Sequence, residues 1–123
     1  DACLLGRGEQ IVRMLAGLRA EGVEPVLVLW ALAREVRALA QMAAAITAGR
    51  TEAAALEAQR VWPRRRPLVS RALRRSSARE WQSLLSRAAR VDRVIKGRRG
   101  GNAWQELECL ALALGGVKLK TCA

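Results

Sequence analysis

Apolar residues recur at helical spacing along most of this 123-residue chain. The first stripe lies in residues 8–20, where apolar side chains stand three or four positions apart. Its members are Ile11, Met14, Leu15 and Leu18. Gly22 follows the stripe, as glycine commonly does just beyond a helix end. The pattern therefore predicts a first helix over residues 8–20.

A second stripe is the longest in the chain and predicts a helix from Pro25 to near Gly49. Proline is favoured in the first turn of a helix, where its missing N–H would have no partner in any case. The apolar positions of this stripe are Val26, Leu29, Trp30, Ala33, Val36, Ala40 and Ala43.

Two shorter helices are expected in the middle of the chain. The first spans about 52–59, with Thr51 as its N-cap, and the second runs from Pro67 to about residue 74. Between them, Trp62 precedes Pro63, and a residue before proline avoids the helical region. We expect the Trp62 side chain to fill part of the core.

The last two helices carry the clearest start signals. Ser77 and Glu80 have the spacing of a capping box, and Asn102 is a second N-cap. We expect helices from Ser77 to Lys96 and from Asn102 to Leu114, ended by glycines. Their apolar stripes are Trp81, Leu84, Leu85, Ala88, Val91 and Ile95, then Trp104, Leu107, Leu110, Ala111 and Leu114.

No sustained alternation of apolar and polar residues predicts a β-strand. We therefore expect an all-α bundle of five to six helices over residues 1–116, followed by a flexible tail at 117–123. The core is expected to bury Trp30, Trp81 and Trp104, because each lies within an apolar stripe.

The charge of the chain is strongly positive, with 22 Lys and Arg against 11 Asp and Glu. This excess indicates an acidic partner or, alternatively, an arginine-rich composition without functional meaning. Seven arginines and no acid lie in residues 60–75; they are Arg60, Arg64, Arg65, Arg66, Arg71, Arg74 and Arg75. This segment is either a contact surface for phosphates or an acidic protein, or a solvated face. Any DNA binding is expected to be weak and non-specific.

Residues for catalysis are scarce, since the chain has no His and no Tyr, and its acids stand beside arginines. We expect no catalytic site, metal, cofactor or small-molecule substrate. The three cysteines lack metal-site spacing, so a reduced protein is expected. The glycine-rich segment 97–101 is interpreted as a helix connector, with phosphate binding as the alternative. The apolar run at 26–33 is too short to cross a membrane.

Several motifs, in this order and spacing, resemble the C-terminal domain family of the bacterial DNA polymerase III delta subunit, part of the sliding-clamp loader. They are Leu15-Ala-Gly-Leu-Arg-Ala-Glu-Gly-Val-Glu-Pro25, Leu29-Trp-Ala-Leu-Ala-Arg-Glu35, Arg60-Val-Trp-Pro63, Leu73-Arg-Arg75, Trp81 with Leu84-Leu85, Asp92-Arg-Val-Ile-Lys-Gly97 and Trp104-Gln-Glu-Leu107. The resemblance covers about residues 5–114.

This resemblance implies a helical collar domain in the bacterial cytoplasm. It would join other clamp-loader subunits in a ring during loading of the sliding clamp in DNA replication. The parent belongs to a DNA-directed DNA polymerase (nucleotidyltransferase) holoenzyme, but this fragment would neither open the clamp nor bind ATP. The candidate subunit interface is on the last two helices, at Leu84, Leu85, Leu107 and Leu110. The alternative function is a basic helical nucleic-acid-binding module.

Overall fold

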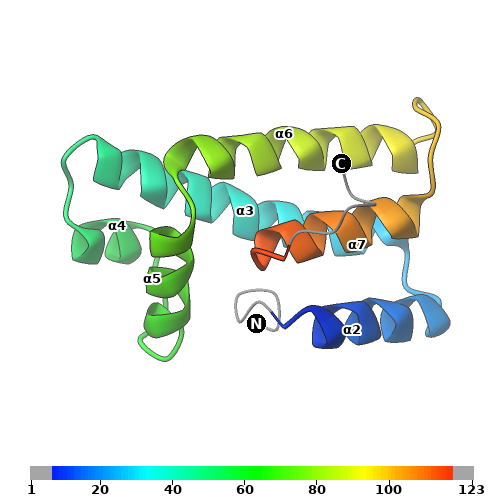
Figure 1. Ribbon diagram of the computed structural model, residues 1–123, viewed down its shortest axis with the longest axis horizontal. Helices are drawn as coiled ribbons and strands as arrows, with labels where there is room; N and C mark the ends of the chain where they lie inside the picture. Colours follow the sequence, from blue (N-terminus) through cyan, green and yellow to red (C-terminus); the bar gives the residue numbers. More distant parts are fainter. Residues whose placement is uncertain (1–6, 118–123) are drawn as a thin grey trace.

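The computed structural model describes residues 7–117, and in that range every regular element is a helix (Figure 1). The helices are α2 (Gly8–Ala20), α3 (Pro25–Thr47), α4 (Glu52–Ala58), α5 (Arg66–Arg75), α6 (Ala78–Ile95) and α7 (Ala103–Leu114). The expected all-α bundle is confirmed. All six helices lie within two or three residues of their expected bounds, because their stripes and caps are strong local signals.

The bundle is built on the packing of α6 along α3, the most extensive helix pair. Helix α7 packs against both α3 and α6, and α2 lies on α7 (Figure 1). Helices α4 and α5 pack near the C-terminal end of α3, where α5 runs across the direction of the long helices. The fold therefore has a long body of four helices and a short arm of two.

Side-chain caps fix three of the helix starts. The Ser77 hydroxyl accepts from the Glu80 N–H and the Glu80 carboxylate accepts from the Ser77 N–H, so the expected capping box is present. The side chains of Thr51 and Asn102 likewise accept a backbone N–H in the first turns of α4 and α7. Each cap satisfies an N–H that a helix cannot satisfy itself.

Five of the six helices described are followed by one residue with a left-handed backbone conformation, at which the chain turns away from the helix. It is a glycine after α2, α3, α6 and α7, and Arg60 after α4. At Arg60 the backbone φ is +54°, its N–H donates to Glu57 and the next N–H, of Val61, donates to Leu56. This is the Schellman arrangement, in which glycine is preferred because it has no Cβ.

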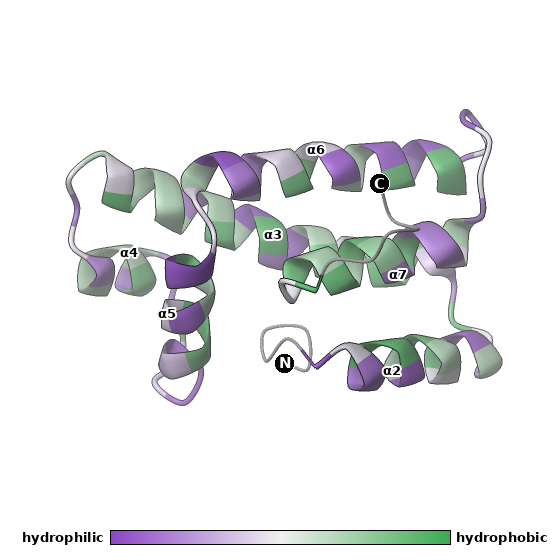
Figure 2. Ribbon diagram, in the orientation of Figure 1, coloured by the Kyte–Doolittle hydropathy of each residue, from purple (hydrophilic) through white to green (hydrophobic). Residues whose placement is uncertain are grey.

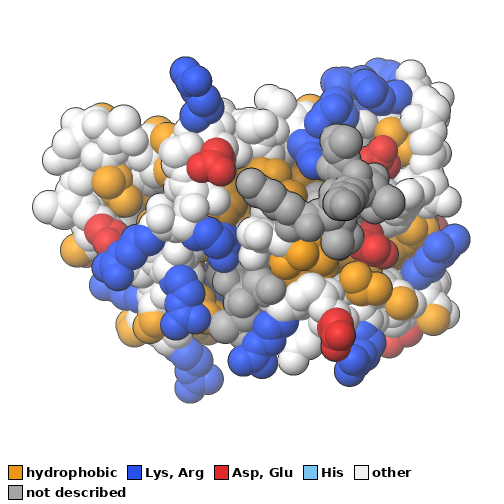
Figure 3. Space-filling view, viewed as in Figure 1, with side chains coloured by type: hydrophobic (Ala, Val, Ile, Leu, Met, Phe, Trp, Pro, Cys, Tyr) orange, Lys and Arg blue, Asp and Glu red, His pale blue; other side chains and the backbone are white. Residues whose placement is uncertain are grey.

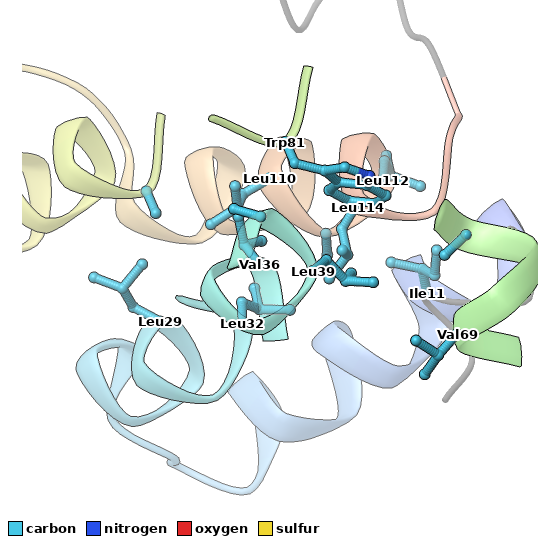
Figure 4. Packing of buried hydrophobic residues seen from close by; sticks show 14 of the residues in the cluster. Ile11, Leu29, Leu32, Val36, Leu39, Val69, Trp81, Leu110, Leu112 and Leu114 are labelled. Carbon is cyan, nitrogen blue, oxygen red and sulfur yellow. The ribbon is translucent and has the colours of Figure 1, made fainter. Parts of the chain in front are cut away.

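The core lies between α3, α6 and α7 and extends to α2 and α5 (Figure 4). Trp81 of α6 is its largest buried side chain, with no exposed surface, and it lies beside Leu112 and Leu114 of α7. The largest other fully buried side chains are Ile11, Val36, Leu39, Val69, Val91, Leu107 and Leu110.

The structure corrects the expected burial of two tryptophans. Trp30 is 60 % exposed and Trp62 is 74 % exposed, whereas Trp81 is buried and Trp104 half-buried. The buried arc of α3 centres near Leu32 and Ala43, and Trp30 points about 150° away from that centre. In the turn between α4 and α5, Val61 packs against the core, whereas the next residue, Trp62, is exposed.

Two further expectations concern residues near the ends of the chain. Cys109 is buried and disulfide-bonded, so the expectation of a reduced protein is wrong at this residue. Val117, the first residue of the expected tail, packs against the core and donates its N–H to Leu112. Residues 118–123 lie outside the described range, so a flexible tail stays a prediction.

The difference in burial between Trp81 and Trp30 gives a first testable prediction. Trp81→Ala should lower the free energy of unfolding by about 3–5 kcal/mol, because it leaves a cavity in the core. Trp30→Ala should lower it by less than about 0.5 kcal/mol, because its side chain is largely in solvent. Urea denaturation followed by circular dichroism measures both. Equal losses would contradict the placement of Trp30.

Candidate functional site

Four of the seven arginines in the basic segment have partners within the domain. Arg65 forms a 2.5 Å ion pair with Glu35 of α3, and Arg74 lies 3.6 Å from Glu52 of α4. Arg66 donates through Nε to the carbonyl of Val61 at 3.3 Å, and Arg75 donates to the carbonyl of Leu114 at 2.6 Å. These four side chains tie α5 to the rest of the fold.

Arg75 makes the most specific of these contacts. Its guanidinium lies at the C-terminal end of α7, where unpaired carbonyls and the helix dipole favour a cation. Its side chain passes over Gly116, where a Cβ would lie only 2.7 Å from Arg75 Cδ. Partial burial lowers the pKa of Arg75, because the charged form loses contact with water. We interpret Arg75 as a structural residue that holds α5 against the end of α7.

The remaining three arginines, Arg60, Arg64 and Arg71, are exposed and form no ion pair with the residues described. Helix α5 has a hydrophilic side and an opposite hydrophobic side that buries Val69 and Ala72 (Figure 2). Lys and Arg side chains gather over α5 and near the α6–α7 turn (Figure 3). Of the expected contact surface, these three side chains are available for an external anion, and Arg74 is also largely exposed despite its 3.6 Å pair with Glu52.

A groove adjoins this surface, between α3 and the turn that leads into α5. It encloses about 480 Å³. Its lining includes Arg34, Glu35, Ala38 and Met42 from α3, residues 59–62 and Arg65 from the turn, and Val69 from α5. The groove combines apolar walls, two exposed arginines and the exposed Trp62.

The four leucines of the candidate subunit interface differ in burial. Leu107 and Leu110 are fully buried in the core, which corrects their expected role, because they have no surface to offer a neighbour. Leu84 and Leu85 are half-buried at the edge of the core. Only these two remain candidates for contact with another subunit.

Three apolar side chains are more exposed than Leu84 and Leu85, and the sequence analysis assigned none of them to an interface. Leu27 is 51 % exposed on α3, one turn before Trp30, and Val12 and Met14 are exposed on α2. These residues sit beside buried positions in the same stripes, so spacing alone assigned Met14 and Trp30 to the core. The helical phase of α3, whose buried arc centres near Leu32 and Ala43, separates Leu27 and Trp30 from the buried positions.

The described residues 7–117 contain no group of His, Cys, Asp and Glu that could hold a metal ion. Within the same range, no helix is both long and apolar enough to cross a membrane. In the segment 97–101, Gly97 ends α6, and the first turn of α7 is capped by Asn102 itself. This geometry suits the expected helix connector.

A family model described as "Processivity clamp loader gamma complex DNA pol III C-term" matches residues 1–121. The chain belongs to this family. It is 33 % identical over 114 residues to DNA polymerase III subunit delta of Escherichia coli (strain K12), a match covering 93 % of this chain and 33 % of the relative. It is 26 % identical over 122 residues to the delta subunit of Haemophilus influenzae, covering 93 % and 36 %. The chain thus spans about a third of each of these relatives.

The roles assigned to the arginines lead to a second prediction for this clamp-loader domain. Arg75→Ala should lower the free energy of unfolding by about 1.5–3 kcal/mol, because it removes a charged donor from the carbonyl of Leu114. Arg71→Ala, an exposed change on the same helix, should stay within about 0.5 kcal/mol. Urea denaturation measures both, and a similar loss at both positions would exclude the structural role of Arg75.

A third prediction follows from the left-handed backbone at Arg60. Arg60→Gly should raise the free energy of unfolding by up to about 1 kcal/mol. The left-handed conformation costs a residue with a Cβ about 1–2 kcal/mol, while the greater freedom of glycine in the unfolded chain offsets part of the gain. Thermal unfolding of the two proteins tests this. A lower midpoint in the glycine variant would mean that the Arg60 side chain itself stabilises the fold.

Proposed function

We propose that this domain joins other clamp-loader subunits in a hetero-oligomer, as the helical C-terminal part of a delta subunit of DNA polymerase III. Membership of the clamp-loader family supports this proposal. According to this proposal, the domain has no catalytic site, cofactor or small-molecule substrate, and it works in the bacterial cytoplasm during DNA replication. Its contribution is a rigid surface on which neighbouring subunits pack.

The main structural observation that supports the proposal is the exposure of large apolar side chains on α2 and α3. A stable interface buries at least about 1,000 Å² in total, and large apolar side chains commonly form its centre. Val12 and Met14 on α2, with Leu27 on α3, present such side chains to solvent. Leu84 and Leu85 on α6 offer a second, partly buried edge. Val12 and Met14 are two positions apart, so they point to opposite sides of α2. We therefore assign the main contact to Leu27 on α3.

A ring of helical domains suits this architecture. The chain buries its core without a partner, since α3, α6 and α7 enclose Trp81 and the leucines around it. Docking then needs no refolding, and a neighbour can pack helix on helix against α2 and α3. We expect the isolated domain to be folded and monomeric when the other subunits are absent.

The fourth prediction tests this assembly by size-exclusion chromatography. The domain mixed with the other clamp-loader subunits should co-elute with them. Leu27→Asp should abolish co-elution, because it places a charge in the apolar contact, yet it should leave the circular dichroism unchanged. Ala44→Asp, an exposed change near the other end of the same helix with the same added charge, should co-elute normally. Failure of the unmodified domain, alongside a full-length delta subunit that does assemble, would refute the proposal.

A further inference from the structure

Helix α6 carries a row of exposed polar side chains along one face. The residues of this row are Arg79, Ser83, Ser86, Arg90 and Arg93, and all five are exposed. They stand alternately four and three positions apart, so they lie on the same face of the helix. Because a helix rises about 1.5 Å per residue, the row is about 21 Å long. We refer to these five side chains as the α6 row.

The α6 row points away from the core. The buried side of the helix includes Trp81, Ala88 and Val91, which lie about 140–160° around the helix from Ser86. Helix α6 packs mainly on α3 and α7, and it forms one long edge of the bundle (Figure 1). The row therefore offers a straight, outward-facing surface to a partner.

The acids of α6 lie off the row and are already bound. They are Glu80 and Asp92, and each lies about 120° around the helix from Ser86. The Glu80 carboxylate accepts the Ser77 N–H in the capping box, and Asp92 pairs with Lys96 at 2.9 Å. The three arginines of the row form no ion pair with any other residue in the range 7–117. The row therefore presents positive charges and hydroxyl groups without a negative charge.

The positive charge of the row continues into the turn between α6 and α7. Arg98 and Arg99 are exposed there, and Lys and Arg side chains gather near this turn (Figure 3). A hollow of about 100 Å³ lies at the same end, lined by Arg87, Arg90, Val94, Arg99 and Glu106. This volume is several times what one water molecule needs, so a phosphate group can enter the hollow. Its three arginines outnumber its one acid, which favours an anion.

We propose that the α6 row and the adjoining turn bind the phosphate backbone of a nucleic-acid duplex. Arginine side chains and small hydroxyl groups are common donors to phosphate oxygens, and the row consists of these two kinds of residue. A row of about 21 Å spans about six base pairs at about 3.4 Å each, so several phosphates lie within its reach. This surface does not depend on subunit assembly, so the chain alone can test it.

Two other kinds of partner fit the row less well. A folded protein usually places large apolar side chains at the centre of a contact, and none of the five side chains of the row is apolar. A single strand is held by stacking of its bases on exposed aromatic rings, whereas the aromatic residue of α6, Trp81, is fully buried. No residue of the row lines the groove between α3 and the turn that leads into α5.

The salt dependence of duplex binding by the 123-residue chain tests the proposal. Fluorescence anisotropy gives the affinity for a labelled blunt duplex of about twelve base pairs between about 50 and 200 mM salt. Each phosphate contact contributes about 0.9 to the slope of log affinity against log salt concentration. Arg90→Ala with Arg93→Ala should therefore make this slope shallower by about 2.

A charge-matched pair of variants on α2 is the control for this measurement. Arg13→Ala with Arg19→Ala also removes two exposed arginines, but α2 lies on α7 rather than beside the row. This pair should leave the slope unchanged. Equal changes in the two pairs would mean that binding follows net charge alone and would refute the site. Absence of duplex binding by the unmodified chain at about 50 mM salt would refute it as well.

A second set of variants adds negative charge to the row and keeps all its arginines. Ser83→Glu with Ser86→Glu should weaken duplex binding at least about tenfold, because carboxylates and phosphates repel each other. Glutamate favours a helix more than serine does, so the circular dichroism should be unchanged. Ser83→Gln with Ser86→Gln adds similar bulk without charge, and Gln10→Glu with Gln105→Glu adds the same charge at exposed positions elsewhere. Both controls should keep most of the affinity, and a tenfold loss in either would contradict the proposal.

Competition with polyglutamate separates a nucleic-acid surface from a surface for acidic proteins. Polyglutamate with the same number of charges should displace the labelled duplex poorly, because its carboxylates are not held on a rigid backbone. Unlabelled duplex should displace it fully. If polyglutamate competes as well as the duplex and also loses affinity for the variant Arg90→Ala with Arg93→Ala, the row binds acidic proteins and the proposal is wrong.

Discussion

The packing of α6 along α3 is the constraint on which the other contacts depend. It buries Trp81 completely, and α7 then fills the space beside that ring with Leu112 and Leu114. Helix α2 reaches the core mainly through α7, and α4 and α5 reach it through α3. Loss of the α3–α6 contact would therefore leave four shorter helices without a common surface. Helices of 7–13 residues are marginal on their own in water, so their stability comes from this packing.

The positive charge of the chain has two physical roles. Arg65, Arg66, Arg74 and Arg75 are bound to acids or carbonyls within the domain, and they position the short arm of α4 and α5. The exposed arginines remain available to a partner. A net charge of +11 therefore overstates the charge that is free to bind nucleic acid. The number of arginines in a segment does not tell how many can bind a partner. An arginine that lies near an unpaired carbonyl at a helix end, as Arg75 does, binds that carbonyl instead.

The exposed large apolar side chains lie on α2, on the first turns of α3 and in the turn before α5. Leu27 lies on the first turn of α3, where we place a neighbouring subunit, and Trp30 follows it by one helical turn. Trp62 lines the groove between α3 and the turn that leads into α5. These side chains lie outside the buried core, which is closed by α3, α6 and α7.

The sequence by itself determined the helices and the family of this protein. The spacing of apolar residues, the capping box at Ser77 and the left-handed glycines are local signals, so they gave the helix bounds correctly. The tertiary structure decided which side of each helix faces the core. Spacing placed Trp30 and Leu110 in equivalent stripes, yet Trp30 is exposed and Leu110 buried. The burial of a side chain depends on the rotation of its helix against its neighbours, and that rotation is set by packing across the whole bundle.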